Sequence, residues 1–209
     1  MNKSAGNRSV TPLSFDTGWF SRRLQLLLAV TVALLILSAR VEAAAASGAA
    51  QFNNKGELLL PVKYRQWVFI GAPVTPNDLN DGKALFPEFH HIYIDPASFA
   101  IYKKTGKIPN GTVFVKELVD VLAKSSANGN GYFSGDFIGL FVSVKDAKRF
   151  PNEPGNVAFF DFLGDNGTLL ERAKSQPTDR CNSCHKQWAA GDLVFSQYYP
   201  VLKAVIQNQ

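Results

Sequence analysis

The residues most able to do chemistry stand close together near the C-terminus. Residues 179–188 read DRCNSCHKQW and hold both cysteines of the chain, Cys181 and Cys184, with His185 directly after the second. C-x-x-C-H is the attachment signature of a c-type haem. At this spacing two thiols can bond the two vinyl groups of one porphyrin edge, and the adjacent imidazole can bind the iron.

A thioredoxin-like redox pair and half of a zinc site are the alternative uses of such a cysteine pair. A redox pair is expected next to a βαβ unit, and the sequence shows no such unit. A structural zinc site takes four ligands, but the chain has only two cysteines and three histidines. A disulfide between Cys181 and Cys184 would close too short a loop to constrain the fold. The sequence therefore favours one covalently attached haem c, held by both cysteines, with His185 as the iron ligand.

The opposite side of the iron decides what such a site could do. Electron-carrying cytochromes c commonly use a His/Met pair, but the only methionine is Met1, which a cleaved leader would remove. His90 or His91 could complete a bis-His site. Otherwise the position is open, which predicts gas binding or small-molecule redox chemistry rather than simple electron transfer.

Residues 1–46 have the pattern of a secretory leader. Arg22 and Arg23 precede the uncharged run 24–39, and small residues with A-x-A spacing follow. Basic, apolar and small-residue regions in this order are typical of a signal peptide. The alternative is a retained anchor, but the run is shorter than the roughly 20 residues of a membrane-spanning helix. The sequence predicts cleavage near residue 46 and a periplasmic location.

Residues 47–209 are predicted to form a single haem domain, which is long enough to bury a core. The chain has 22 basic and 17 acidic residues, but residues 47–209 alone have 17 and 15. Much of the net charge of +5 therefore belongs to the leader. Because the domain carries no basic patch, the sequence indicates no nucleic-acid partner.

Strand-forming runs precede the haem motif. Strands are expected at residues 65–74, 89–95, 111–119, 132–144 and 156–163. Helical signals are fewer and lie mainly after these runs. This order predicts a mainly β, α+β domain, in which an antiparallel sheet with a few packed helices encloses one c-type haem.

Two helices are expected around this sheet. Asp95 suits the N-cap of a helix that begins at Pro96, and Gly106 can end it after Thr105. Residues 193–207 also look helical, with Pro200 as a break or kink.

The chain resembles the cytochrome P-460 family over essentially the whole of residues 47–209. The segments that carry the resemblance include TPNDLNDGKALFPEFHHIYIDPASFAIYKKTG, GTVFVKELV, GNGYFSGDFIGL and CNSCHKQWAAGDLVFSQYYPVL. The resemblance implies a mostly antiparallel β fold around one c-type haem, a periplasmic homodimer, and a lysine covalently joined to the porphyrin. It also implies oxidation of hydroxylamine, often with nitric oxide, to nitrous oxide or nitrite, with a soluble cytochrome as electron acceptor.

The resemblance places the lysine–haem bond at Lys116. Strand alternation puts Lys116 in line with Phe114 and Leu118 on an apolar face. A buried ammonium there is costly unless it is paired or neutralised, and a bond to the ring would remove the charge. The alternatives are that Lys116 pairs with a carboxylate, or that Lys103 or Lys104 forms the bond.

Two distal residues follow from the resemblance. Phe141 matches a position at which oxidising members carry a glutamate that relays protons above the iron. Phenylalanine cannot act as a base, and Phe141 instead resembles the apolar wall of the related cytochromes c′-beta, which bind nitric oxide without the lysine bond. A nitric oxide-binding protein without hydroxylamine turnover is therefore the alternative function. His90 matches a basic distal residue that could donate a hydrogen bond to a ligand or bind the iron, although strand alternation does not tell whether His90 or His91 faces the haem.

Overall fold

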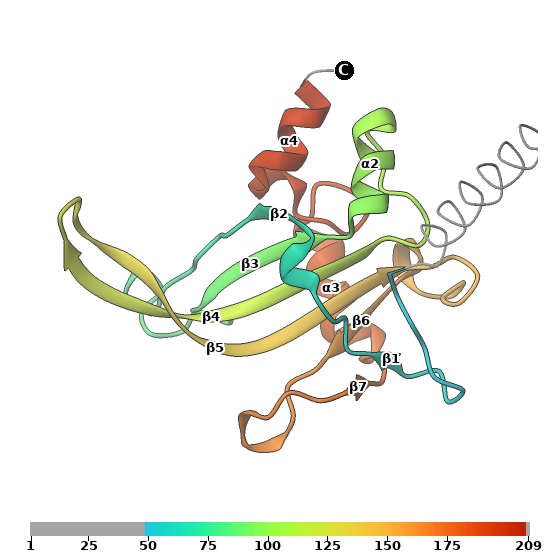
Figure 1. Ribbon diagram of the computed structural model, residues 1–209, viewed down its shortest axis with the longest axis horizontal. Coiled ribbons are helices and arrows are strands. Elements are labelled where there is room, and N and C mark those ends of the chain that lie inside the picture. Colours follow the sequence, from blue (N-terminus) through green and yellow to red (C-terminus); the bar gives the residue numbers. More distant parts are fainter. Residues whose placement is uncertain (1–48, 208–209) are drawn as a thin grey trace, which may run out of the picture. The chain divides into compact units, whose positions relative to one another are not determined.

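A five-stranded antiparallel sheet carries the candidate site. The computed structural model describes residues 49–207, and the strands of this sheet lie in the order β2-β3-β4-β5-β6 (Figure 1). Their bounds are β2 Val68–Gly71, β3 Phe89–Ile94, β4 Val113–Ser126, β5 Gly129–Lys145 and β6 Val157–Asp161. A second antiparallel sheet pairs β1 Leu58–Leu59 with β7 Arg172–Ala173. The predicted mainly β, α+β fold is confirmed, and the predicted signal peptide lies outside the described residues.

Three α-helices lie in the described part of the chain: α2 Pro96–Thr105, α3 Thr178–Trp188 and α4 Pro200–Gln207. Five short 3-10 helices join the other elements: η1 Tyr64–Gln66, η2 Asn77–Leu79, η3 Pro154–Asn156, η4 Asp165–Gly167 and η5 Ser196–Tyr198. None of the helices within residues 49–207 is long and apolar enough to cross a membrane.

The caps of α2 are those that the sequence predicts. Asp95 Oδ1 accepts a hydrogen bond of 2.8 Å from the Ser98 amide, and Pro96 occupies the first turn. Gly106 ends the helix with a φ of 65°, the left-handed conformation that glycine adopts most easily.

The helices near the C-terminus agree with the expectation only in part. The sequence predicts no helix at the haem motif, but the motif lies on α3, whose sequence TDRCNSCHKQW has no apolar stripe to reveal it. Pro200 breaks the helical stretch 193–207 as predicted. The short helix η5 ends before it, and Pro200 begins α4, where its missing N–H leaves no unmet hydrogen bond.

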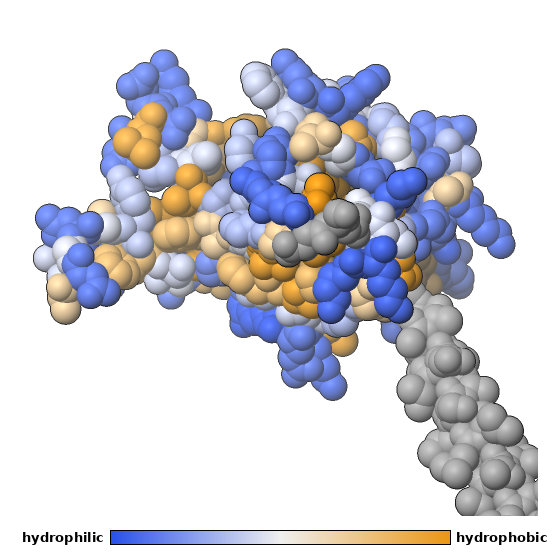
Figure 2. Space-filling model, turned by 90° about the horizontal axis from the view of Figure 1, so that it is seen from above, coloured by the Kyte–Doolittle hydropathy of each residue, from blue (hydrophilic) through white to orange (hydrophobic). Residues whose placement is uncertain are grey.

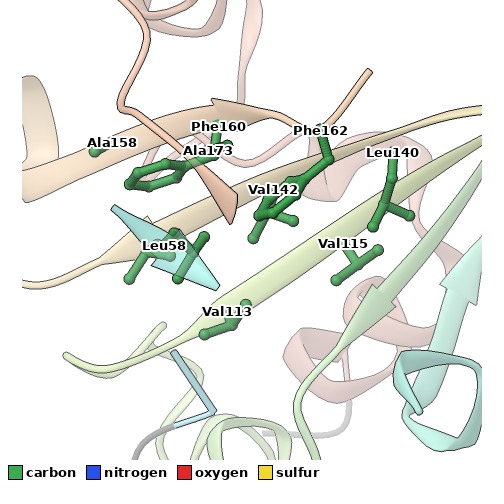
Figure 3. Packing of buried hydrophobic residues seen from close by; sticks show 10 residues of the cluster. Leu58, Val113, Val115, Leu140, Val142, Ala158, Phe160, Phe162 and Ala173 are labelled. Atoms are coloured by element: carbon green, nitrogen blue, oxygen red, sulfur yellow. The ribbon is translucent and has the colours of Figure 1, made fainter. Parts of the chain in front are cut away.

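Both faces of the large sheet are covered near β4. Figure 3 shows the core on one face, where side chains of β4, β5 and β6 pack beneath β1 and β7. This core consists of Leu58, Val113, Val115, Leu140, Val142, Val144, Ala158, Phe160, Phe162 and Ala173. Complete burial of a valine, leucine or phenylalanine side chain stabilises the folded state by about 1.5–3 kcal/mol relative to an exposed one.

The opposite face of the sheet is covered by α2 and α4. Ile92, Ile94 and Phe114 of the sheet form a second core with Tyr102 of α2 and Leu202 of α4. The face of the molecule seen from above mixes hydrophilic and hydrophobic residues (Figure 2). The face with the second core continues along β3, β4, β5 and β6 into the candidate site.

Candidate haem site

The register of the large sheet lines up Lys116 and Phe141 on one face. Lys116 of β4 lies directly opposite Ile92 of β3 and Phe141 of β5, and Phe141 lies opposite Asp161 of β6. Side chains of directly opposed residues in antiparallel strands stand on the same face. Lys116, Phe141 and Asp161 therefore form one row across three strands.

The two adjacent histidines face opposite sides of this sheet. His90 is two residues from Ile92 along β3 and therefore shares the face of Lys116. His91 points to the other face, where its Nδ1 lies 4.0 Å from the buried carboxylate of Glu117. Of the two, the structure brings His90 to the candidate site.

Lys116 has a buried amine among aromatic rings. Its Nζ lies 3.7 Å from the centre of the Phe86 ring and 4.8 Å from that of Phe141. Burial lowers the pKa of Lys116 to about 8, against opposing effects of which the largest comes from Cys181 and the next from Glu88. The lowered pKa makes the neutral amine, which is the nucleophilic form, far more available than in an exposed lysine.

The other lysines considered from the sequence lie elsewhere. Lys103 and Lys104 are exposed in the last turn of α2, and Lys103 Nζ lies 5.4 Å from the Phe99 ring. No ion pair found within residues 49–207 includes Lys116. Among these lysines, the geometry favours Lys116 for a bond to a ring held at this face.

The helix α3 presents the two cysteines one turn apart. Cys181 is half-buried and Cys184 is exposed, and both are free thiols. Burial raises the pKa of Cys181 against the opposing charges of Arg180 and Lys116. Because both cysteines also act on the pKa of Lys116, the thiols and the amine lie within electrostatic reach of one another.

Asn182, between the two cysteines, fixes α3 against the sheet. Its side chain is buried, and Nδ2 donates a 3.2 Å hydrogen bond to the carbonyl of Val157 at the start of β6. Nδ2 also lies 3.4 Å from Oε2 of Glu153. No sequence pattern indicates this role, because an asparagine inside a polar segment is most often exposed.

His185 has a fixed orientation with one nitrogen free. Its Nδ1 donates a 2.7 Å hydrogen bond to the carbonyl of Leu193, so the neutral ring keeps an unshared electron pair on Nε2. The ring packs against those of Phe159 and Phe195, at centre-to-centre distances of 4.4 and 4.8 Å. Burial lowers the pKa of His185 and so favours the neutral form that binds metals.

The carbonyl that orients His185 belongs to an unusual turn. Asp192 and Leu193 have φ values of 50° and 57°, and the Val194 amide donates to the Gly191 carbonyl over 2.8 Å. A leucine in the left-handed region is strained, and such strain is concentrated at functional sites. Lys145 of β5 forms an ion pair with Asp192 and holds the turn to the sheet.

His90 and Phe86 lie together at the β3 side of the site, next to Phe141. His90 Nε2 lies 3.2 Å from the carbonyl of Phe86, to which it donates, and the Phe86 ring lies 5.8 Å from that of Phe141. Burial, together with the charge of Lys116, lowers the pKa of His90 to about 4. Neutral His90 thus has its one N–H engaged, and donation to a ligand would require it to leave Phe86.

These residues fit a haem c by the chemistry of their donors. Two thiols stand one helical turn apart, the next residue offers a free imidazole Nε2, and aromatic side chains line the adjoining face. Cys181 and Cys184 would hold the ring and His185 the iron. Phe86, Phe159, Phe195 and the turn at Leu193 were not expected from the sequence, because loop and strand contacts alone bring them to the site.

One comparison with known proteins matches this chain. A family model described as cytochrome P-460 matches residues 61–196, well over half of the 209-residue chain. The match includes His90, Lys116, Phe141 and the whole haem motif. No curated protein matches the chain.

Proposed function

The chain belongs to the cytochrome P-460 family, and from this premise we propose that it oxidises hydroxylamine, with nitric oxide as a co-substrate, to nitrous oxide or nitrite. Family membership implies a haem c cofactor and a small ligand bound at the haem. The finer assignment is one haem, bonded to Cys181 and Cys184, with His185 on the iron and Lys116 joined to the ring. The other side of the iron is open to the substrate.

The observation that carries this proposal is the position of the Lys116 amine. It is buried on the same face as Phe141, within electrostatic reach of both cysteines, and its lowered pKa favours the neutral nucleophile. A charged amine in these surroundings is costly. A covalent bond to the ring would remove that cost and would account for a lysine at this buried position.

The side chains around the site have separate tasks. His185 binds the iron through Nε2, while Leu193, Phe159 and Phe195 fix its ring. Phe86 and Phe141 exclude water from the ligand side. The haem, when bound, supplies a redox-active iron that binds a small nitrogen compound and takes up its electrons.

Nitric oxide binding without turnover is the second candidate function. It is favoured by Phe141, which stands in the row with Lys116 and offers no proton acceptor. In that case the protein would bind diatomic gases behind an apolar wall, and Lys116 would carry no adduct.

Turnover separates the two functions. Protein purified from a host that matures c-type cytochromes is mixed with hydroxylamine, nitric oxide and a soluble oxidant, and nitrous oxide, nitrite and reduced oxidant are measured over many equivalents. Sustained product formation is expected from the proposed function. Binding that changes the absorption spectrum without continued product formation would assign the protein to the second function.

Location, assembly and the electron acceptor form part of the same proposal. We place the mature protein in the periplasm as a homodimer that passes electrons to a soluble cytochrome. The exposed apolar side chains of Phe133, Phe137 and Ile138 on β5 support an interface between two copies. Light scattering of the purified protein is expected to give twice the mass of one chain, and the mass of one chain would contradict the homodimer.

A further inference from the structure

Glu88 has a carboxylate oxygen that is buried without a partner. Within residues 49–207 its Oε2 is the one buried side-chain nitrogen or oxygen that makes no hydrogen bond. Such a group costs free energy unless something binds to it. An unpaired acceptor in an otherwise satisfied interior therefore points to a ligand.

Glu88 lies at the candidate haem site. It follows Phe86 by two residues and precedes His90 by two; the Phe86 ring lies 3.7 Å from the Lys116 amine, and His90 Nε2 donates to the Phe86 carbonyl. Of the charges that raise the pKa of Lys116, that of Glu88 has the second-largest effect, after Cys181. The carboxylate therefore lies within electrostatic reach of the amine, in the segment that leads from Phe86 into β3.

A second carboxylate near Lys116 has its partners within the protein. Asp161 Oδ1 accepts a 2.9 Å hydrogen bond from the Leu163 amide, and Oδ2 lies 4.0 Å from Arg180 Nη2. Asp161 thus has its oxygens engaged, while Glu88 Oε2 does not. Of the two carboxylates, Glu88 has the available acceptor.

We propose that Glu88 accepts a hydrogen bond from the N–H or O–H group of the small ligand bound at the haem. This inference rests on the proposed function and identifies the residue by which the site would distinguish one small ligand from another. Phe86 and Phe141 admit any small molecule, whereas an unpaired carboxylate stabilises a ligand that can donate, such as hydroxylamine, over carbon monoxide or nitric oxide, which cannot.

The same contact supplies the base that Phe141 cannot provide. Nitric oxide and hydroxylamine give nitrous oxide, water, one proton and one electron, so turnover must release a proton from the ligand. An N–H or O–H bond of the ligand breaks, its proton goes to Glu88 Oε2, and the electron pair stays on the ligand. The electron leaves to the soluble acceptor that the proposed function already requires.

Ligand affinities of haem-loaded variants test this assignment. Hydroxylamine and carbon monoxide are titrated against wild type, Glu88→Gln and the matched control Asp161→Asn, with binding followed by haem absorption. Glu88→Gln is expected to weaken hydroxylamine binding roughly tenfold to a hundredfold, since it removes a charged acceptor. Carbon monoxide affinity of Glu88→Gln, and both affinities of Asp161→Asn, are expected to change by less than about threefold.

A spectroscopic measurement keeps the test independent of turnover and of folding defects. Removing a negative charge near bound carbon monoxide is expected to lower its C–O stretching frequency in Glu88→Gln and not in Asp161→Asn. Glu88→Asp, which keeps the carboxylate, is expected to recover part of the hydroxylamine affinity. Haem content and circular dichroism show whether each variant is folded.

Two outcomes would overturn the assignment of Glu88. One is an unchanged hydroxylamine affinity in Glu88→Gln, and the other is an equal loss for hydroxylamine and carbon monoxide. If the wild-type protein binds hydroxylamine without turnover, the proposed enzymatic function is wrong. The difference in hydroxylamine affinity between wild type and Glu88→Gln still decides the role of Glu88 in that case. Wild type that binds no hydroxylamine would overturn both.

Discussion

Lys116 and Phe141 stand directly opposite each other on β4 and β5, and the Lys116 Nζ lies 4.8 Å from the centre of the Phe141 ring. The pair places a nucleophilic amine beside an apolar wall. The Lys116 amine suits a covalent bond to the haem, and the Phe141 ring suits the exclusion of water from the site.

Replacing Lys116 is expected to remove the bond between lysine and haem without releasing the haem. In Lys116→Ala the haem should remain attached through Cys181 and Cys184, while the shifted ferrous absorption of a lysine-bonded ring should disappear. Absorption spectra together with intact mass measure both. Lys104→Ala, at an exposed position of α2, is the control and should keep the shifted spectrum. A shifted spectrum in Lys116→Ala would assign the bond to another residue.

His90 is expected to make the protein sensitive to acid. Its folded-state pKa of about 4 lies below the ordinary value of 6.5, so the unfolded chain binds more protons between these pH values. The free energy of unfolding should therefore fall as the pH drops from 6.5 to 4, by at most about 3 kcal/mol from this residue.

Denaturant unfolding of His90→Gln at a series of pH values checks this expectation. The variant should lose part of the slope between pH 6.5 and 4, and His91→Gln, on the opposite face of β3, should keep it. Equal slopes in wild type and His90→Gln would show that His90 is not the group that titrates.

Asn182 is expected to contribute to the docking of the haem helix. Asn182→Ala removes the donor to the Val157 carbonyl and leaves that acceptor buried, which should lower the free energy of unfolding by about 1–3 kcal/mol. The exposed neighbour Ser183 bonds only to the Asp179 carbonyl within α3. Ser183→Ala should therefore change stability by less than about 0.5 kcal/mol, and an equal loss in both variants would refute the docking role.

The turn at Asp192 is expected to depend on a residue that tolerates the left-handed conformation. Asp192→Ala should destabilise the protein by about 1–2 kcal/mol, because alanine disfavours this conformation and the ion pair with Lys145 is lost. Asp192→Asn keeps the conformational tolerance and should cost less than about 1 kcal/mol. Urea unfolding measures both, and similar losses would mean that the ion pair rather than the backbone matters.

Local signals made part of this structure predictable from the sequence. The caps of α2 depend on Asp95, Pro96 and Gly106 alone, so its bounds follow from neighbouring residues. The strands follow from their β-branched and aromatic runs. The helix α3 was missed because its fold depends on Asn182 and the sheet rather than on an apolar stripe.

The site required register and loop geometry that no sequence pattern supplies. The motif identifies Cys181, Cys184 and His185, but pairing across β3, β4 and β5 is what selects His90 over His91 and sets Phe141 opposite Lys116. The Leu193 carbonyl lies at the site only because residues 191–194 form a left-handed turn.

In the proposed function His185 holds the iron from one side, in a ring bonded to two cysteines and a lysine, and the other side of the iron is open. The most direct measurement combines intact mass under denaturing conditions with ferric and ferrous absorption spectra of the protein from a host that matures c-type cytochromes. The expected result is the mass of one mature chain plus one haem, and a five-coordinate iron with shifted absorption. A colourless product, or a six-coordinate iron with two protein ligands, would contradict it.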